Sequence, residues 1–413
     1  MTKDPKGRDA KTIKDDLRTG TPYWLKTPNV TVQSGRMTER DHFDAIIVGA
    51  GISGALVAEA LTRQGSKVLI LDRRAPVRGS SPASTAMIQH EIDIPMIHHI
   101  RDMGTTKANA VWRRSAKAVQ DLVDLVDDLG LDCQMQAKQA LYLTGNILGS
   151  RAMQDEAAAR KAAGIAAEYL NAPALRDRFG LDRTGAIVSD ASASANPAQM
   201  TAGLLKVAQS RGAVILSDTE VTDMAELPSG VALATADGQA LTADHVVFCT
   251  GYEFLPAMQS ATHQITSTWA LASEPGLAHP DWLDDFLVWE AAEPYLYYRT
   301  TPDGRIIVGG EDEDSPDRND DPALLDEKAR AICDKLRDLA GIDIGKPAYV
   351  WSAAFGNTTD GLPIIDRVPR HDRVFAVMGF GGNGITFSVI ASQVIAAAIA
   401  GKPDPDAKLF AFR

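Results

Sequence analysis

Hydrophobic and polar residues follow two different periods along this chain, and their order predicts a mixed α/β protein. Ala45 to Val48 and Lys67 to Leu71 contain short apolar runs, which are typical of strands buried in a parallel sheet. Ala55 to Gln64, between these runs, is predicted to be a helix. From Thr105 to Leu129 apolar side chains recur at i, i+3 and i+4, and Gly130 ends this second predicted helix.

The rest of the chain adds a hairpin and further strand and helix units. Aromatic and β-branched runs at 295–299 and 305–310 flank the turn signal Pro302-Asp-Gly, and this pattern predicts an antiparallel hairpin. Asn196-Pro197-Ala-Gln199 predicts a helix start, because the asparagine can cap the first amides and the glutamine can bond back to the cap. The other predicted strands lie at 140–144, 213–216, 220–222, 241–249, 287–289 and 374–378, and the other predicted helices at 153–163, 200–210, 323–339 and 384–400.

The order of these elements predicts two domains, as expected for a chain of 413 residues. The first is a Rossmann-like nucleotide-binding domain, which is discontinuous in sequence. The second is built on an antiparallel sheet and interrupts the first. The predicted boundaries are 41–139, 196–255 and 352–413 for the nucleotide-binding domain, and 140–195 and 256–351 for the inserted domain.

Two segments lack a regular hydrophobic pattern. Residues 1–40 form a predicted N-terminal arm, in which residues 1–20 are polar and expected to be loose. Tyr23 and Trp24 interrupt this polar arm, and we expect them to cover the edge of the core. Asp312 to Asp321 is acidic, and we predict a solvated loop rather than a metal site because the carboxylates follow no ligand spacing.

A glycine pattern, Gly49-x-Gly51-x-x-Gly54, marks the junction of the first predicted strand and helix. The first glycine allows a tight turn, the second lets backbone N–H groups approach a pyrophosphate, and the third lets the helix pack close to the strand. Asp72 ends the next strand at about the ~20-residue offset where a carboxylate can accept a hydrogen bond from a ribose hydroxyl. Together these features predict a dinucleotide site, whereas the glycines alone would also suit an ordinary turn.

Three other segments could reach the same cofactor. Gly79 to Ser84 is rich in small and hydroxyl residues that can line a pyrophosphate channel, although by itself it would be a surface loop. Cys249-Thr250-Gly251-Tyr252 is a turn that follows a predicted strand. Gly379 to Gly384 opens an apolar helix, and unpaired N–H groups at a helix N-terminus stabilise negative charge.

Composition and charge argue against several classes of function. A net charge of -12 without a basic stripe argues against a nucleic-acid partner. Cys133, Cys249 and Cys333 are too few and too far apart for a disulfide framework or a structural zinc site. Residues 1–41 lack the apolar core of a secretory signal, and the apolar stretch 385–400 is shorter than the ~20 residues of a membrane span. We therefore expect a cytoplasmic protein with no membrane span and no metal.

The order of the motifs resembles the FAD-dependent oxidoreductase family that includes D-amino-acid oxidase, glycine oxidase and sarcosine oxidase. The resemblance covers about residues 40 to 410. Tyr23-Trp24 and the C-terminal glycine turn look most like the γ-glutamylputrescine oxidase branch. The motifs that carry the family resemblance are the glycine pattern, Asp72-Arg73, Ser84-Thr85-Ala86, Cys249-Thr250-Gly251, Asp360-Gly361-Leu362-Pro363 and Gly379 to Thr386.

The resemblance implies a set of residues that bind FAD. Gly49, Gly51, Ile52, Ser53 and Gly54 should hold the diphosphate, Asp72 the adenosine ribose, and Arg73 the adenine side. Ser84, Thr85 and Ala86 should lie near the pyrophosphate and the ribityl chain, Val221 should contact the adenine side through its backbone, and Thr250 and Gly251 the diphosphate. Gly381, Gly382, Asn383, Gly384, Ile385 and Thr386 should address a flavin carbonyl. For each of these residues, the alternative is a structural role in the core or in a turn.

Three departures from the family pattern limit what the resemblance implies about the substrate. Residues 352–356 contain no cysteine where sarcosine oxidase anchors its flavin, so FAD should be held noncovalently. Phe355 and Gly382 stand where glycine oxidase has arginines, so a simple α-amino acid would lose its bidentate clamp. Arg299 on the predicted hairpin could replace them, or could form a surface salt bridge.

The implied reaction is oxidation of a C–N bond in an amine or amino-acid derivative by hydride transfer to flavin N5, which gives an imine. Oxygen or a quinone would then accept the electrons. His90 and Tyr298 are candidates for groups near the flavin, with Arg299 and Trp351 shaping the pocket, although His90 could equally be a core histidine. Three alternatives stay open: oxidation of a hydroxy substrate, a noncatalytic FAD-carrying subunit of a larger oxidase, and an NAD-binding protein, which the C-terminal glycine turn disfavours.

Overall fold

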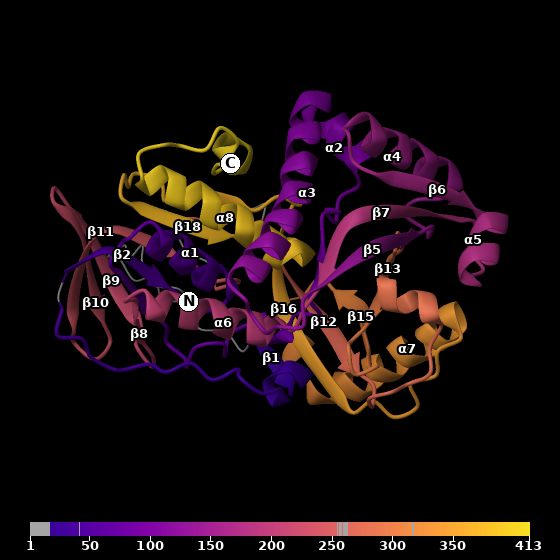
Figure 1. Cartoon of the computed structure of the whole chain (residues 1–413), viewed down its shortest axis with the longest axis horizontal. Helices are drawn as coiled ribbons and strands as arrows, with labels where there is room; N and C mark the ends of the chain where they lie inside the picture. The colour runs from indigo at the N-terminus through magenta and orange to yellow at the C-terminus, as the bar shows by residue number, and fades with distance from the viewer. Residues whose placement is uncertain (1–16, 41, 254, 256–257, 259–262, 316–317) are drawn as a thin grey trace.

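The chain folds around two large β-sheets that meet along one side (Figure 1). The computed structural model describes residues 17–413 except 41, 254, 256–257, 259–262 and 316–317. One sheet is mainly parallel and the other mainly antiparallel, which confirms the predicted mixed α/β class. The prediction for residues 1–16 lies outside the described part of the chain.

The mainly parallel sheet has the strand order β17-β18-β11-β2-β3-β8, with the β9–β10 ribbon attached to β11. Its central strands are apolar on both faces because both faces are covered. Ile47 packs in the cluster formed with the helices α1, α6 and α8, and Ile46 packs in the cluster that contains Val231 and Leu233 of β10. The bounds are β2 His42–Val48, β3 Val68–Leu71, β8 Val214–Leu216, β9 Val221–Leu227, β10 Gly230–Thr235, β11 Ala240–Phe248, β17 Ile364–Arg367, β18 Val374–Met378, α1 Ile52–Arg63, α6 Pro197–Ser210 and α8 Gly384–Ile399.

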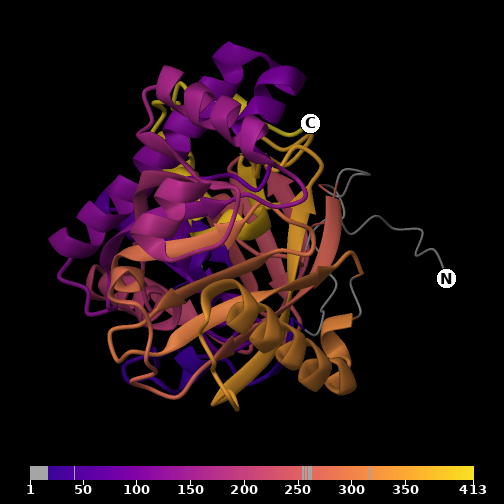
Figure 2. The ribbon, with the colours of Figure 1, turned by 90° about the vertical axis from the view of Figure 1, so that its right-hand side faces the viewer.

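The mainly antiparallel sheet has the order β1-β16-β12-β15-β14-β13-β5-β7-β4, with β6 paired to β7. Helix α7 contacts β12, β14, β15 and β16, and Figures 1 and 2 show it against the outer face of these strands. The strand bounds are β1 Arg18–Gly20, β4 Met87–Gln89, β5 Gln136–Leu143, β6 Ala167–Asn171, β7 Gly185–Ser194, β12 His263–Ala272, β13 Phe286–Glu290, β14 Leu296–Thr300, β15 Ile306–Glu313 and β16 Tyr349–Thr358. The helices are α2 Met96–Met103, α3 Thr105–Asp128, α4 Ser150–Ala162, α5 Ala172–Phe179 and α7 Pro322–Ala340.

Two strands of this sheet come from segments that the sequence assigned wholly or mostly to the nucleotide-binding domain. β4 lies within 41–139, and β16 crosses the predicted boundary at residue 352. The chain therefore passes between the two sheets more often than the hydrophobic pattern indicates. The division into domains at the stated residues stays a prediction.

The beginning of the described chain is anchored rather than loose. β1 pairs with β16, and the Arg18 guanidinium donates hydrogen bonds to the carbonyls of Arg78 and Gly79 at 2.8 and 2.9 Å. Trp24 is fully buried and donates to the Ser84 carbonyl at 2.8 Å. For residues 18–24 the arm is thus part of the fold and supports the 79–84 segment.

The cap of α6 and the hairpin of β14 and β15 form where the sequence predicts them. The Asn196 side chain accepts from the amides of Ala198 and Gln199, which confirms the predicted cap of α6. Gln199 does not bond back to the cap, because its amide donates instead to the Pro28 carbonyl of the N-terminal segment at 3.1 Å. The hairpin of β14 and β15 is present as predicted.

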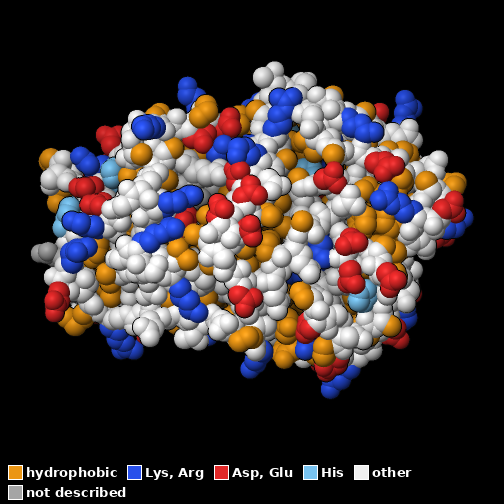
Figure 3. All heavy atoms as spheres, viewed as in Figure 1, with side chains coloured by type: hydrophobic (Ala, Val, Ile, Leu, Met, Phe, Trp, Pro, Cys, Tyr) orange, Lys and Arg blue, Asp and Glu red, His pale blue; other side chains and the backbone are white. Residues whose placement is uncertain are grey.

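The acidic segment that starts at Asp312 differs from its prediction. Asp312 is still in β15 and accepts a hydrogen bond from the Tyr295 hydroxyl, so this carboxylate is not a solvated loop residue. On the face drawn in Figure 3, acidic and basic side chains are interspersed over the surface. Among the described residues, no group of three or more potential metal ligands occurs.

Helix α8 is the central apolar helix of the protein. The segment Gly381–Ile399 has the length and composition of a membrane span, but 67% of its apolar window is buried inside the protein. α8 contacts α1 and α3, and a hydrogen bond of 2.8 Å joins Ser53 of α1 to Ser388 of α8. Its apolar character is therefore explained by packing among other helices.

Gly54 provides a test of the close approach between α1 and β2. A Cβ atom at this position would lie 1.9 Å from the Gly49 carbonyl oxygen, whereas one at Gly79 would meet nothing within 4 Å. We expect Gly54→Ala to lower the free energy of unfolding by about 2–3 kcal/mol, because the helix must move away from the strand. Gly79→Ala is the control and should change stability little. Urea unfolding of both variants measures the difference, and equal stabilities would contradict the close-packing argument.

Candidate functional site

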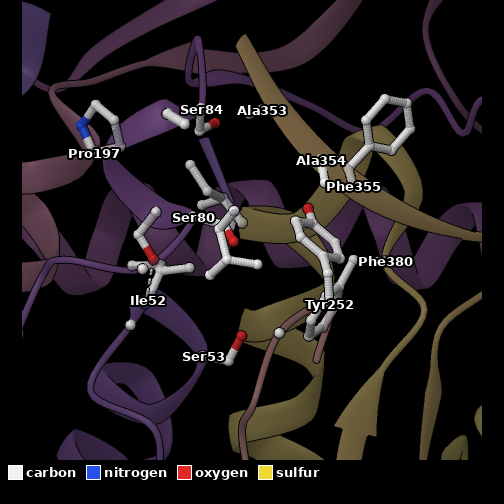
Figure 4. Close-up of a pocket in the computed structure, with 18 of the residues that line it drawn as sticks. Ile52, Ser53, Ser80, Ser84, Pro197, Tyr252, Ala353, Ala354, Phe355 and Phe380 are labelled. Carbon is white, nitrogen blue, oxygen red and sulfur yellow. Dashed lines mark hydrogen bonds between the residues drawn. The ribbon is translucent and has the colours of Figure 1, made fainter. Parts of the chain in front are cut away.

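A large cavity lies where the two sheets meet, and both contribute to its walls (Figure 4). The α1 side supplies Ile52 and Ser53, and β16 supplies Phe355. Tyr252 lies beside Phe380, with ring centroids 6.5 Å apart. The lining thus combines glycine turns and hydroxyl residues on one side with aromatic rings on the other.

The first glycine turn forms one end of this cavity. Gly49 has φ +115°, and a Cβ atom there would lie 2.2 Å from the Cys249 carbonyl oxygen, so only glycine fits. Gly51 caps α1 without a side chain and leaves the helix N-terminus facing the cavity. The Ile52 amide donates to the Ser81 hydroxyl at 2.8 Å, which fixes the hydroxyl-rich segment beside the turn. This arrangement can hold a pyrophosphate.

Asp72 lies beside this turn, at the end of β3. Its carboxylate accepts hydrogen bonds from the amides of Ala50 and Arg74 at 2.7 and 2.8 Å. Burial raises the pKa of Asp72, and these two hydrogen bonds lower it. The carboxylate is therefore held in a fixed position at the cavity wall, where it can accept a further hydrogen bond from a ribose.

Two arginines line the cavity near Asp72, and both are close to one buried glutamate. Arg74 makes a bidentate ion pair with Glu253 at 2.9 and 2.8 Å. Arg73 lies 3.8 Å from Glu253 and 4.0 Å from Glu220. Their positive charge is thus balanced locally.

The C-terminal glycine turn is bound to a second segment, Gln89 to Asp93, which we call the strap. The Asn383 side chain donates to the carbonyls of Gln89 and Glu91 at 3.2 and 2.7 Å, and the Thr386 hydroxyl donates to the Gln89 carbonyl at 2.9 Å. The Gly382 amide donates to the Asp93 carboxylate at 2.8 Å. The side chains of Asn383 and Thr386 therefore hold the strap, while the backbone of the turn faces the cavity.

Most residues predicted to bind the cofactor are brought together in this cavity. Gly54 is the helix-packing glycine, and Ala86, Val221 and Thr386 are buried without lining the cavity. Val221 packs in the core cluster that contains Leu233 of β10. The predicted residues that do line the cavity are Gly49, Gly51, Ile52, Ser53, Asp72, Arg73, Ser84, Thr85, Thr250, Gly251, Gly381, Gly382, Asn383, Gly384 and Ile385.

The four predicted catalytic residues do not line the cavity, and we no longer assign them this role. His90 is fully buried, with Nδ1 3.3 Å from the Ala191 carbonyl, and burial lowers its pKa. Tyr298 packs in the core of the antiparallel sheet. Trp351 donates to the Ala83 carbonyl at 2.9 Å and packs in the core beside the helices.

Arg299, the fourth candidate, is neither a substrate clamp nor a surface residue. It is fully buried under the Trp24 ring and donates to the carbonyls of Thr85, Thr300 and Ala195. Burial lowers its pKa to about 9. Arg299 therefore supports the backbone of the segment that carries Thr85.

Other aromatic residues occupy the position predicted for Tyr298. Tyr295 and Tyr297 line the cavity together with Trp289 and Thr268. Side chains alternate between the two faces of a strand, so Tyr297 faces the cavity while Tyr298 faces the core. Alternation within the run 295–299 indicates that Tyr295 and Tyr297 share a face opposite to Tyr298, but not which face lines the cavity.

The tyrosines and Asp312 form one electrostatic group behind this wall. Burial and the nearby Asp312 raise the pKa of both Tyr295 and Tyr297. Burial raises the pKa of Asp312 to about 6, although the nearby Thr268 hydroxyl and the hydrogen bond from Tyr295 lower it. The antiparallel-sheet side of the cavity is therefore aromatic and acidic.

The fold and the cavity define a dinucleotide-binding protein whose glycine turns and Asp72 fit an FAD. Comparison with known proteins identifies the family to which the chain belongs. The chain belongs to the DAO family of FAD-dependent oxidoreductases, since the family model matches residues 44–398. FAD is therefore its cofactor, and residues 352–356 contain no cysteine for a covalent link.

Relatives in sequence and structure extend over most of the chain. The probable oxidoreductase OrdL of Haemophilus influenzae is 23% identical over 395 residues, covering 92% of this chain and 88% of that protein. Glycine oxidase of Bacillus licheniformis is 24% identical over 373 residues, which cover 88% of this chain and 95% of that protein. The crystal structure of glycine oxidase from Geobacillus kaustophilus has a TM-score of 0.76 at 20% identity, covering 91% of this chain and 99% of that one. This last likeness shows a shared fold.

Asp72 offers a test of the nucleotide end of the cavity. We expect Asp72→Asn to raise the Kd for FAD about tenfold, because a charged acceptor for the ribose is lost. Titration of the apoprotein with FAD, followed by quenching of flavin fluorescence, measures this Kd. Asp218→Asn, which changes an exposed ion pair with Arg36, is the control. An equal Kd for FAD in both variants would show that Asp72 does not contribute to FAD binding.

Asp312 generates a prediction about pH. Its folded-state pKa of about 6 lies above the usual value of 3.8, so the folded protein holds this proton more tightly than the unfolded chain. The contribution of Asp312 to stability therefore falls as the pH rises from about 4 to 6. We therefore compare the free energy of unfolding of Asp312→Asn with that of the wild type. As the pH rises from 4.5 to 7.5, the difference should shift in favour of the variant by about 1–3 kcal/mol. Urea unfolding at both pH values measures this gain, and a pH-independent difference would contradict it.

Proposed function

We propose that this protein oxidises a C–N bond in an amine or amino-acid derivative and produces an imine. The observation that carries the proposal is a single cavity that runs from the dinucleotide turn to an aromatic wall on the antiparallel sheet. Curated relatives named glycine oxidase and N-methyl-L-tryptophan oxidase support the same bond type. Bound FAD would accept a hydride from the carbon that carries the nitrogen.

The chain's own residues would bind and orient the substrate. Trp289, Tyr295 and Tyr297 provide apolar surface that can hold the substrate against the cofactor and exclude water. Residues 381–384 line the cavity, and the Gly382 N–H is engaged by Asp93. The other backbone N–H groups of this turn would stabilise negative charge that develops on the cofactor. Positioning and electrostatics, rather than a side-chain nucleophile, would therefore carry the reaction.

The electron acceptor is part of the proposal. Either oxygen or a quinone would reoxidise the cofactor, and a cytoplasmic location remains our expectation. Oxidation of a hydroxy substrate and a noncatalytic FAD-carrying role are the alternatives that the same experiment separates from amine oxidation.

Anaerobic reduction of the bound flavin tests the proposal. The purified yellow holoenzyme should lose its visible flavin absorbance when an amine or amino acid from a chemical panel is added without oxygen, because two electrons move to the flavin. Hydroxy acids of matching carbon skeleton are the control and should leave the colour unchanged. Peroxide release on readmission of air identifies oxygen as the acceptor, and dye reduction without peroxide identifies a quinone-type acceptor. Bleaching by hydroxy acids alone would replace the proposal by C–O oxidation, and no bleaching would favour a noncatalytic role.

A further inference from the structure

The distribution of charge along the cavity differs between its two ends. Arg73 and Arg74 are the basic residues among the described lining residues, and both lie beside Glu253 at the nucleotide end. The antiparallel-sheet side carries neither lysine nor arginine in the described lining. A substrate carboxylate would therefore find no cationic partner on that side.

Asp93 places a negative charge in this region instead. Its side chain lines the cavity and is exposed there, and it accepts a hydrogen bond from the Gly382 amide at 2.8 Å. A Cβ atom added at Gly381 or at Gly382 would lie 2.7 or 3.0 Å, respectively, from an oxygen of the Asp93 carboxylate. The carboxylate therefore lies across the glycine turn. Burial among protein atoms raises the pKa of Asp93, and the Gly382 hydrogen bond lowers it.

Asp93 cannot move far from the turn. Asn383 holds the carbonyls of Gln89 and Glu91, and Glu91 is ion-paired with the fully buried Arg160 at 3.2 Å. The strap is thus fixed on both sides, and its carboxylate stays at the cavity wall.

The surroundings of Asp93 suit an organic cation. Its charge acts on Tyr252, Tyr295 and Tyr297, whose rings line the same cavity. Phe355 and the 92%-buried Trp289, whose indole N–H has no hydrogen-bond partner among the described residues, complete the aromatic wall. Aromatic faces beside a carboxylate attract ammonium groups. Asp312 adds negative charge behind Tyr295, while Lys328 is engaged by Glu313 at 2.7 Å.

We infer that this site selects a cationic amine, with Asp93 as the residue that receives the ammonium group and the aromatic wall as its enclosure. The inference names the substrate class for the proposed function and rests on that function for the bond that is oxidised. A simple amino acid, whose carboxylate would face Asp93, is disfavoured by repulsion.

The first test uses binding to the holoenzyme and requires no turnover. Tetramethylammonium and pivalate are non-oxidisable probes of similar shape and opposite charge, and each is titrated while the visible spectrum of the bound flavin is recorded. We expect the cation to bind at least about tenfold more tightly than the anion. Equal affinity, or tighter binding of pivalate, would overturn the inference.

The second test changes the carboxylate. Asp93→Asn should weaken tetramethylammonium binding about tenfold and leave pivalate binding equal or stronger, whereas Asp93→Glu should retain the preference for the cation. Asp190→Asn, at an exposed residue outside the cavity lining, is the control. An unchanged cation affinity in Asp93→Asn would show that Asp93 does not receive the ammonium group. If the variant does not retain FAD, the comparison of tetramethylammonium with pivalate in the wild type decides the inference.

A third measurement separates this inference from the proposed function. Anaerobic flavin reduction is compared for an α,ω-diamine and for the ω-amino acid of the same chain length. Faster reduction by the diamine supports the inference. Faster reduction by the amino acid contradicts the inference but leaves C–N oxidation intact, and cation-selective binding with no reduction by any amine refutes the proposed function alone.

Discussion

The hydrogen bonds between the C-terminal glycine turn and the strap are the constraint on which the site depends. Asn383 and Thr386 stand at the start of α8, in the helix layer of the parallel sheet, whereas Gln89 ends β4 of the antiparallel sheet. Their bonds to strap carbonyls therefore join the two halves of the protein at the cavity. All of these bonds are buried. Loss of the Asn383 side chain would remove the donor to the Glu91 carbonyl at a cost of about 1–3 kcal/mol, whereas the Gln89 carbonyl would keep the Thr386 hydroxyl as a donor.

A buried ionic network supports the strap from its other side. Arg160 of α4 lies 3.2 Å from Glu91 and 2.8 Å from Glu156, and all three side chains are fully buried. Glu156 also accepts hydrogen bonds from the amides of Met96 and Ile97 at the start of α2. Such a network is a weak source of net stability, but removing one partner leaves an uncompensated charge at about 3–5 kcal/mol. Its structural effect is to fix where the strap and α2 lie.

With both sides of the strap fixed, the cavity has two chemically distinct ends. Asp72 and the first glycine turn provide backbone N–H groups and a ribose acceptor at the nucleotide end. The antiparallel sheet provides aromatic surface and negative charge. The fold thus separates cofactor recognition from substrate recognition.

Sequence by itself determined the mixed fold, the glycine turn, Asp72 and most of the cofactor cavity, because these depend on local backbone geometry and short-range strand and helix patterns. It did not determine the substrate wall. Tyr297 and Tyr298 are neighbours of the same type, and only the pairing of β14 within its sheet decides which one faces the cavity. Asp93 and Asp312 were not identified because their significance comes from segments far away in sequence: Gly382 lies 289 residues from Asp93. Long-range packing, rather than local propensity, placed these charges at the site.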